Sequence, residues 1–272
     1  MNTWYLLSEQ EPQEAAVNMA VDQHLLELTE SGRLDRPVLR IYAWKRPTLS
    51  LGYHQQWKQT VDQDALKTHG VDLVRRWTGG RAVLHDCDEI TYSLTAGFQE
   101  PFGKRVTHNY RLIGQALEAF TNIGEATGKR WETEETTADV KKMRHAPCFA
   151  SLSQSEIETM GKKLIGSAQK LGKDCFLQHG SIPLSHRANV LEAVTGARLD
   201  MNSFMISLTD LYENAGRPLP DRSLLVSLLV QAFAMEFQVK FQDFEATGIM
   251  DRHAILQIAK DKFQSDAWTY RK

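Results

Sequence analysis

Two spacings of hydrophobic positions run through the chain and predict two kinds of element. Apolar residues that recur every three or four positions predict helices, and these occupy residues 12–31, 59–69, 107–123, 187–194, 221–237 and 251–263. Alternating or β-branched segments predict strands, and these occupy residues 4–7, 37–44, 48–52, 157–160, 163–168, 176–182 and 239–241. Residues 71–94 indicate three more strands joined by turns, the first turn containing Gly79-Gly80.

The order of these elements favours one fold class. Strands and helices come in uneven clusters instead of a regular alternation, which favours an α+β fold with a mixed or antiparallel sheet over a doubly wound fold. Two further stretches carry expectations of their own. Residues 224–235 form the most apolar segment and predict a buried helix, whereas residues 208–219 are polar and predict a loop.

Composition narrows the possible functions. The chain has 272 residues, of which 42% are hydrophobic and 24% charged, as in an ordinary globular protein. Its net charge of −2 argues against a nucleic-acid partner, which would select a strongly basic surface. Three cysteines without a signal peptide indicate a cytoplasmic protein, and the lack of a long apolar run argues against a membrane span.

One stretch, from Cys148 to Pro183, combines residues that nucleophilic catalysis needs. A thiol attacks as its thiolate, and a nearby ammonium such as that of Lys163 favours the thiolate. The two residues are 15 positions apart, which suits two strands folded back on each other with a turn at Gly161-Lys162. Small residues after Lys163 are typical of a strand that a ligand approaches closely. The alternative is a buried, inert cysteine and a solvated lysine.

A second stretch, Arg75 to His85, joins adjacent arginines to a glycine pair. Arginines at a strand end can bind a carboxylate or phosphate, and two glycines allow a ligand to lie against bare backbone. The alternative is a β-hairpin with solvated arginines. The sequence has no Walker or dinucleotide-binding glycine motif, so it gives nucleotide binding no separate support.

Histidines near the cysteines raise the question of a metal site. The pairs are His85 with Cys87, His145 with Cys148, and Cys175 with His179. They lie on separate elements and include no C-x-x-C motif, so we expect no metal site. His145 could instead act as a base toward Cys148, although its position before Ala146-Pro147 favours a surface loop.

Together these stretches resemble a known family. The segments RRWTGGRAVLHD, GKKLIGSAQ and LQHGSI, with NMAVDQHLL and RPTLSLGYHQQ before them, are similar to the biotin/lipoate protein ligase superfamily in its lipoate branch. The pattern most resembles the octanoyltransferases that use a cysteine and a lysine. That resemblance implies a mixed, mostly antiparallel central sheet flanked by helices, in one domain over residues 1–272 that the segment after about 184 completes with helices.

The resemblance also implies roles for individual residues. Cys148 would carry the acyl group as a thioester, and Lys163 would lower the pKa of its thiol. The residues implied to line or support the acyl tunnel are Arg76, Gly79, Gly80, His85, Gly166, Ser167, Ala168, His179 and Gly180.

We therefore expect an acyltransferase. It would move an octanoyl group from acyl carrier protein to a lysine of a lipoyl domain, with the glycine cleavage H protein as the acceptor that the resemblance suggests, and without a cofactor. Two alternatives stay open: an ATP-dependent lipoate ligase that forms an acyl-adenylate, and a non-catalytic binder of acylated carrier domains.

Lysines around the two proposed catalytic residues give one further expectation. Acyl carrier proteins are acidic, so a basic rim would speed their encounter with the enzyme. Its candidates are Lys141, Lys142, Arg144, Lys162, Lys170 and Lys173. The alternative is that these side chains are simply solvated.

Overall fold

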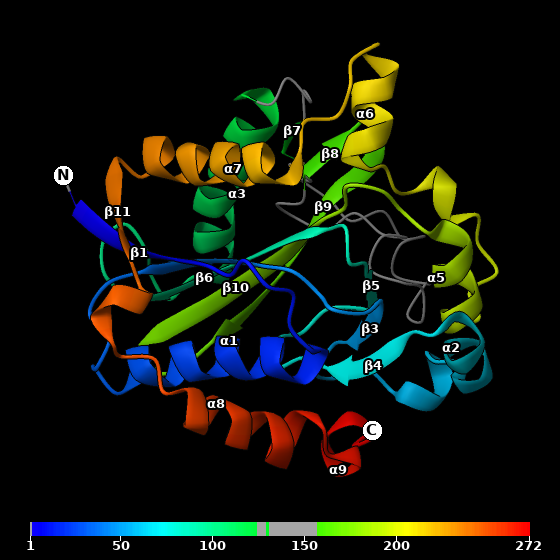
Figure 1. The fold of residues 1–272 in the computed structure, drawn as a ribbon, viewed down its shortest axis with the longest axis horizontal. Coiled ribbons are helices and arrows are strands. Elements are labelled where there is room, and N and C mark those ends of the chain that lie inside the picture. The colour runs from blue at the N-terminus through cyan, green and yellow to red at the C-terminus, as the bar shows by residue number, and fades with distance from the viewer. Residues whose placement is uncertain (1, 124–128, 131–156) are drawn as a thin grey trace.

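The computed structural model describes residues 2–123, 129–130 and 157–272 (Figure 1). Cys148 and the neighbouring His145, Lys141, Lys142 and Arg144 therefore lie outside the described residues. Within the described part, one large sheet has eight strands. In spatial order they are β11 (Val239–Asp243), β1 (Asn2–Ser8), β2 (Val38–Tyr42), β6 (Ile90–Gly97), β10 (Cys175–Ile182), β9 (Lys162–Leu171), β8 (Ile157–Thr159) and β7 (Lys129–Arg130).

The large sheet is mixed and mostly antiparallel, which confirms the expected α+β class. β1 runs parallel to both of its neighbours, β11 and β2, and every later pair is antiparallel. The predicted run of strands after residue 157 is present as β8, β9 and β10. Its first turn is Met160-Gly161, one residue earlier than expected, and both residues have positive φ values of 53° and 73°. Such a two-residue turn matches the twist of the strands that it joins.

A small second sheet lies beside the large one, and its strand order contradicts the alternative that Gly79-Gly80 joins a β-hairpin. Within the described residues its strands are β4 (Asp72–Arg75), β3 (Thr48–Leu51) and β5 (Val83–His85), in that order. β3 lies between the other two, parallel to β4 and antiparallel to β5. The two strands that flank Gly79-Gly80 therefore do not pair, and the hairpin reading is wrong. The connection instead crosses over β3, which makes residues 76–82 a loop at the edge of this sheet.

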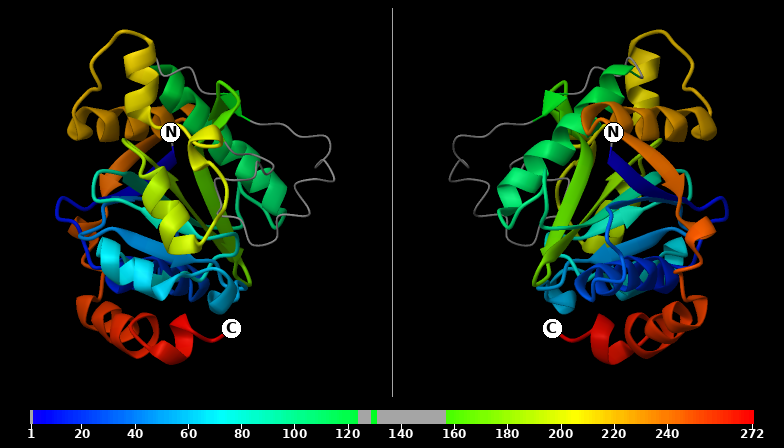
Figure 2. Two further views of the ribbon diagram at one scale, coloured as in Figure 1. Left: turned by 90° about the vertical axis from the view of Figure 1, so that its right-hand side faces the viewer. Right: turned by 90° about the vertical axis from the view of Figure 1, so that its left-hand side faces the viewer.

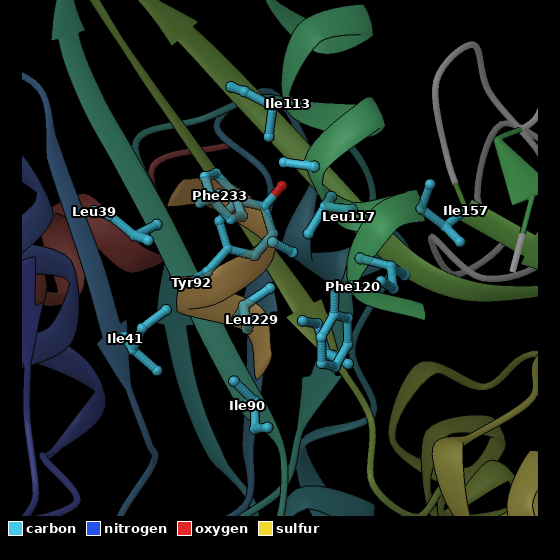
Figure 3. Packing of buried hydrophobic residues seen from close by; sticks show 14 of the residues in the cluster. Leu39, Ile41, Ile90, Tyr92, Ile113, Leu117, Phe120, Ile157, Leu229 and Phe233 are labelled. Atoms are coloured by element: carbon cyan, nitrogen blue, oxygen red, sulfur yellow. The ribbon is translucent and has the colours of Figure 1, made fainter. Parts of the chain in front are cut away.

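Helices cover both faces of the large sheet (Figure 2). On one face, α1 (Ala15–Glu30) packs against β6 and β10, and α8 (Arg252–Ile258), with the π-helix Ala259–Phe263 that follows it, packs on the outer side of α1. On the other face lie α3 (Val106–Ile123) and α7 (Arg222–Glu236). Figure 3 shows Leu117 and Phe120 of α3 in one packed cluster with Tyr92 of β6 and Phe233 of α7, with Leu117 lying beside Tyr92. This interior forms because the apolar residues of α3 recur at helical spacing and so share one face.

Two elements of the second half differ from expectation. Residues 208–219 contain the helix α6 (Leu208–Asn214), which was predicted to be a loop. Its Ser207 and Asp210 form a reciprocal capping box, so polar residues here stabilise a helix start. The helix α7 is only half buried, because Leu225 and Leu229 face the core while Leu224 and Met235 are 48% and 60% exposed.

Among the described residues, the α-helices not yet named are short. They are α2 (Gln63–His69), α5 (Ala188–Thr195) and α9 (Asp266–Thr269). Gly70 ends α2 with a positive φ of 62°, so the helix ends at the predicted residue 69 but begins at Gln63 instead of residue 59. Among the residues described, no helix is both long and apolar enough to cross a membrane.

Candidate active site

A pocket lies between the two sheets and beside α1. β9 and β10 form one wall, β3 and β5 the opposite wall, and Met19 of α1 closes one side. The space measures about 380 Å³ including its opening to solvent, near the lower end of the range for small-molecule sites, about 300–1,000 Å³. Seven of the predicted acyl-site residues line it: Arg76, His85, Gly166, Ser167, Ala168, His179 and Gly180.

His179 of β10 is held by a chain of hydrogen bonds. Its Nδ1 lies 2.9 Å from Oδ2 of Asp22 on α1, and its Nε2 lies 2.7 Å from the Thr78 hydroxyl. Burial lowers the pKa of His179, and Asp22 only partly opposes this effect. A neutral ring that donates from Nδ1 to Asp22 can accept the Thr78 proton at Nε2.

Asp22 stays ionised although it is buried. Burial raises the pKa of its carboxyl group, but Arg40 and His179 outweigh burial and hold the pKa below its ordinary value. Arg40 Nη1 lies 2.8 Å from Asp22 Oδ1, and the Ser93 hydroxyl donates to the same oxygen at 2.8 Å. The carboxylate is thus fixed from three sides.

His85 of β5 takes part in a second chain of the same kind. Its Nδ1 lies 2.7 Å from Glu89 Oε1, and its Nε2 lies 2.8 Å from the Ser50 hydroxyl. Burial raises the pKa of Glu89, but His85 and the hydroxyl donors around it outweigh burial and lower the pKa. The Trp44 ring stacks on His85 with centroids 4.0 Å apart, which fixes the plane of the imidazole.

Arg76 joins the two chains. Its Nε donates to the Thr78 hydroxyl at 3.1 Å, and its Nη1 donates to the Ser50 hydroxyl at 3.1 Å and to the Ser50 carbonyl at 2.8 Å. A single guanidinium therefore holds both hydroxyls that face the two histidines.

The predicted glycine pair supports Arg76 instead of lining the pocket. Arg76 Nη2 donates to the carbonyl of Gly79 at 2.7 Å and to that of Arg81 at 2.7 Å. Gly80 has a φ of +90°, and a Cβ there would lie 2.8 Å from Arg76 Nη2. The loop is therefore folded around the guanidinium, and Gly80 is required by backbone conformation and by space.

Gly180 is required by contacts across three strands. It lies between Ser167 of β9 and Tyr92 of β6 in the sheet register. Because it has no side chain, the Tyr92 hydroxyl reaches across it to within 2.7 Å of Ser167 Oγ. A Cβ on Gly180 would lie 2.5 Å from the Tyr92 ring and 2.7 Å from Ser167 Oγ.

Lys163 lies at the start of β9 and is fully buried. Its backbone is held on both sides, by Glu158 of β8 and by the segment 204–206, where its N–H donates to the Phe204 carbonyl at 2.9 Å. The strand that fixes Lys163 continues to the pocket wall at Gly166. Its partner Cys148 lies outside the described residues, so their pairing and both catalytic roles stay predictions.

The two described cysteines are poor nucleophiles. Burial, and to a smaller extent Glu30, raises the pKa of Cys175 to about 11. Burial also raises the pKa of Cys87, together with Asp86 and Asp88. Their thiolates are therefore scarce at neutral pH. No group of three or more metal-ligating side chains occurs in the described ranges.

Sequence reasoning missed the residues that orient the two histidines. Asp22 and Asn18 are buried polar residues four positions apart on the predicted helix, where an amphipathic pattern would place apolar residues. That irregularity was the available signal. Glu89, in the turn before β6, and Ser50, on β3, gave no such signal, because isolated polar residues in turns and strands are usually solvated.

Comparison with known proteins identifies the family. Residues 14–220 match the family model of the lipoyl protein ligase A/B catalytic domain. The octanoyltransferase LipM of Anoxybacillus flavithermus is 36% identical, with 94% of each chain covered. That of Lysinibacillus sphaericus is 33% identical over the full length of both chains.

Solved structures of low sequence identity share the fold. A lipoate-protein ligase A bound with ATP has a TM-score of 0.79 at 20% identity, covering 99% of each chain. A bipartite lipoate protein ligase with its E2 lipoyl domain from Thermoplasma acidophilum has a TM-score of 0.75 at 18% identity, covering 99% of this chain and 97% of that one. Since its relatives over the whole chain are octanoyltransferases, the expected octanoyl transfer in lipoate biosynthesis is confirmed, and the chain belongs to the lipoyl protein ligase A/B catalytic-domain family.

Proposed function

We propose that the chain takes an octanoyl group from the phosphopantetheine thioester of acyl carrier protein, holds it on Cys148, and passes it to a lysine amine of a lipoyl domain. The glycine cleavage H protein is the acceptor that the family resemblance suggests. Transfer from thioester to thioester to amide is downhill, so this function needs neither ATP nor a metal ion. Covalent catalysis divides the transfer into two easier steps.

The position of Lys163 carries the proposal. It is fully buried on a strand that is paired on both sides and that continues into the pocket wall. An ammonium in such a place interacts strongly with a neighbouring anion, because little water screens it. A thiolate on Cys148, 15 positions earlier in the sequence, would be favoured by that charge.

The chemistry then follows in two balanced steps. The Cys148 thiolate attacks the thioester carbonyl, a new thioester forms, and the released thiolate of the donor takes a proton from Lys163. The acceptor amine next attacks the acyl-cysteine, the amide forms, and the Cys148 thiolate leaves. The amine proton returns to Lys163, which restores the starting state.

We assign the acyl chain to the pocket between the sheets. Gly166, Ala168 and Gly180 leave room for the methylene chain along β9 and β10. Ser167, Arg76, His85 and His179 are fixed by the hydrogen bonds described above, so the wall is rigid and prepared before the ligand enters. Gly79 and Gly80 would act indirectly, through Arg76.

The proposal is tested by incubating the protein with octanoyl acyl carrier protein in the absence of ATP. Intact mass should increase by one octanoyl group, and peptide mapping should place it on Cys148. Cys148→Ser should lose transfer, while Cys87→Ser and Cys175→Ser should retain it as matched controls. Lys163→Met, which keeps a long apolar stem, should slow acylation by about 100-fold or more.

Other outcomes would favour the alternatives. If Cys148→Ser still modifies the lipoyl domain when given ATP and free octanoic acid, the protein acts as a ligase. If the wild-type protein binds the acylated carrier but forms neither acyl-enzyme nor product under either condition, it acts as a binder.

We also propose that residues 1–272 form one catalytic domain in the cytoplasm. β11 from the segment after residue 184 completes the edge of the large sheet beside β1, which supports a single unit. A thiolate nucleophile works in a reducing compartment, which supports the location.

A further inference from the structure

Three cations gather around two neighbouring tryptophans, Trp77 after the two arginines and Trp268 near the C-terminal end. Lys262 Nζ lies 4.0 Å from the centre of the Trp77 ring, and Lys170 Nζ lies 4.8 Å from the centre of the same ring. Arg271 packs over Trp268, whose ring also contacts Lys262. We call Lys170, Lys262 and Arg271 the cation cluster.

The fold brings these residues together from distant parts of the chain. Lys170 lies on β9, two positions after Ala168, and so on the same face of the strand. The C-terminal residues dock against Arg75: Trp268 Nε1 donates to the Arg75 carbonyl at 2.8 Å, and Arg75 Nε donates to the Thr269 carbonyl at 2.9 Å. The loop after β4 and the C-terminal end of the chain thus share one surface.

The cluster carries more positive charge than its surroundings neutralise. Lys262 Nζ donates to the neutral amide oxygen of Gln23 at 2.6 Å, and Arg271 Nη2 to the Tyr53 hydroxyl at 3.0 Å. Within the described ranges no carboxylate forms an ion pair with any of the three cations. Burial, with Lys170 and Arg271, lowers the pKa of Lys262 to about 8 against the opposing effect of Glu27. A bound anion would relieve this repulsion.

The cation cluster adjoins the acyl pocket. Arg76 lines the pocket and precedes Trp77, and Ala168 lines it two residues before Lys170. Two residues along a strand span about 7 Å. The three side chains are half buried and held against aromatic rings, which limits their rotamers. Such an arrangement suits a compact anion better than a broad protein surface.

We propose that the cation cluster binds the phosphate of the donor's phosphopantetheine arm. This inference rests on the proposed function, because it concerns the thiol half of the same thioester. The arm would lie over Trp77, with its acyl end in the pocket and its phosphate on Lys170, Lys262 and Arg271.

The experiment compares two small donors that differ only in the phosphate. Octanoyl-phosphopantetheine and octanoyl-pantetheine are each given to the wild-type protein, and kcat/KM for acylation is measured. We expect the phosphorylated donor to be better by about tenfold, as for a charge-assisted contact. In the variant K170Q/K262Q/R271Q the ratio of the two values should fall to about one. Lys260→Gln, an exposed lysine two positions before Lys262, should keep the wild-type ratio.

The ratio is internal to each variant, so partial loss of folded protein does not alter it. A wild-type ratio near one, or an unchanged ratio in the triple variant, would overturn the inference while leaving acyl transfer intact. If neither donor acylates the protein, the proposed function fails. Calorimetry then decides the phosphate site alone: phosphopantetheine should bind more tightly than pantetheine, inorganic phosphate should compete, and equal binding of the two would overturn the inference.

Discussion

At the scale of single residues, two histidines face the pocket from opposite walls, and each is hydrogen-bonded to a buried carboxylate. Asp22 orients His179, and Glu89 orients His85. Both carboxylates have pKa values below their ordinary range because partners outweigh burial. The polar wall is therefore ionised and ordered at neutral pH, and it need not rearrange when an acyl chain enters.

The first residue-scale prediction concerns pH. The pKa of His179 is lowered in the folded protein, mainly by burial, so the unfolded chain binds its proton first as pH falls. Stability that is present above about pH 6.5, the ordinary value, should decline as the pH falls toward the folded pKa. Thermal midpoints measured from pH 7.5 to 5 should show this decline, and His179→Gln should make it shallower. His253 is an exposed histidine on α8, so His253→Gln should leave the decline unchanged. If the wild-type midpoint were constant from pH 7.5 to 5, burial of a neutral His179 would be the wrong description.

Asp22 should also make the folded protein less stable as the pH falls, but in a more acidic range. Its pKa is lowered in the folded protein, so its contribution to the free energy of unfolding is present above about pH 4, the ordinary value, and is lost as the pH falls below it.

At the scale of elements, β10 is the strand on which the site depends. The side chains of its neighbours β6 and β9 form a hydrogen bond across it, between the hydroxyls of Tyr92 and Ser167. This is possible only where β10 has a glycine. A glycine inside a strand usually weakens it, so its presence indicates a close approach.

Gly180→Ala should therefore be strongly destabilising for a single methyl group. The added Cβ would meet the Tyr92 ring at 2.5 Å, and overpacking of this kind costs about 1–3 kcal/mol. Gly97→Ala on β6 is the matched control, because its Cβ would make only an ordinary contact at 3.8 Å. Urea unfolding should show a lower midpoint for Gly180→Ala alone. Equal midpoints for the two variants would mean that the sheet adjusts and that Gly180 has no packing role.

Much of the arrangement of strands and helices could be predicted from the sequence. The run of strands from β8 to β10 follows from short alternating segments and glycine turns, because antiparallel neighbours are local in the chain. The helix α6 was missed because its capping box consists of polar residues that also favour loops. Of the residues predicted for the site, those on β9 and β10 lie together in the pocket. The hydrogen bond from Arg76 to the Gly79 carbonyl could not be predicted, because it depends on a side-chain conformation that residue spacing does not indicate.

At the scale of the whole molecule, the pairings that could not be predicted are parallel and long-range. β3 joins β4 across α2, and β1 joins β11 from the other end of the chain. Neither pairing produces a periodic pattern in the sequence, because which strands pair here depends on how the helices and sheets pack around the core. The docking of Trp268 on Arg75 is of the same kind.

A chain that ends at residue 238 tests the importance of the β1–β11 pairing. Without β11, the hydrogen-bonding edge of β1 is open, and open edges pair with other chains. We expect this variant to aggregate on concentration in light-scattering measurements. A chain that ends at residue 265 keeps β11 and should stay dispersed, although it loses the Trp268 contact. Aggregation of both to the same extent would assign the effect to residues 266–272, which include α9 and which both chains lack.

The pairing of β1 with β11 also bears on how the protein is made. Asn2 is translated long before its partner Val239. At 5–20 residues per second, roughly 10–50 s separate the two. During that time β1 can pair with β2 but has no partner on its other side. Until β11 has been translated, the nascent chain therefore has an open strand edge at β1, and only then can the last edge strand of the large sheet pair.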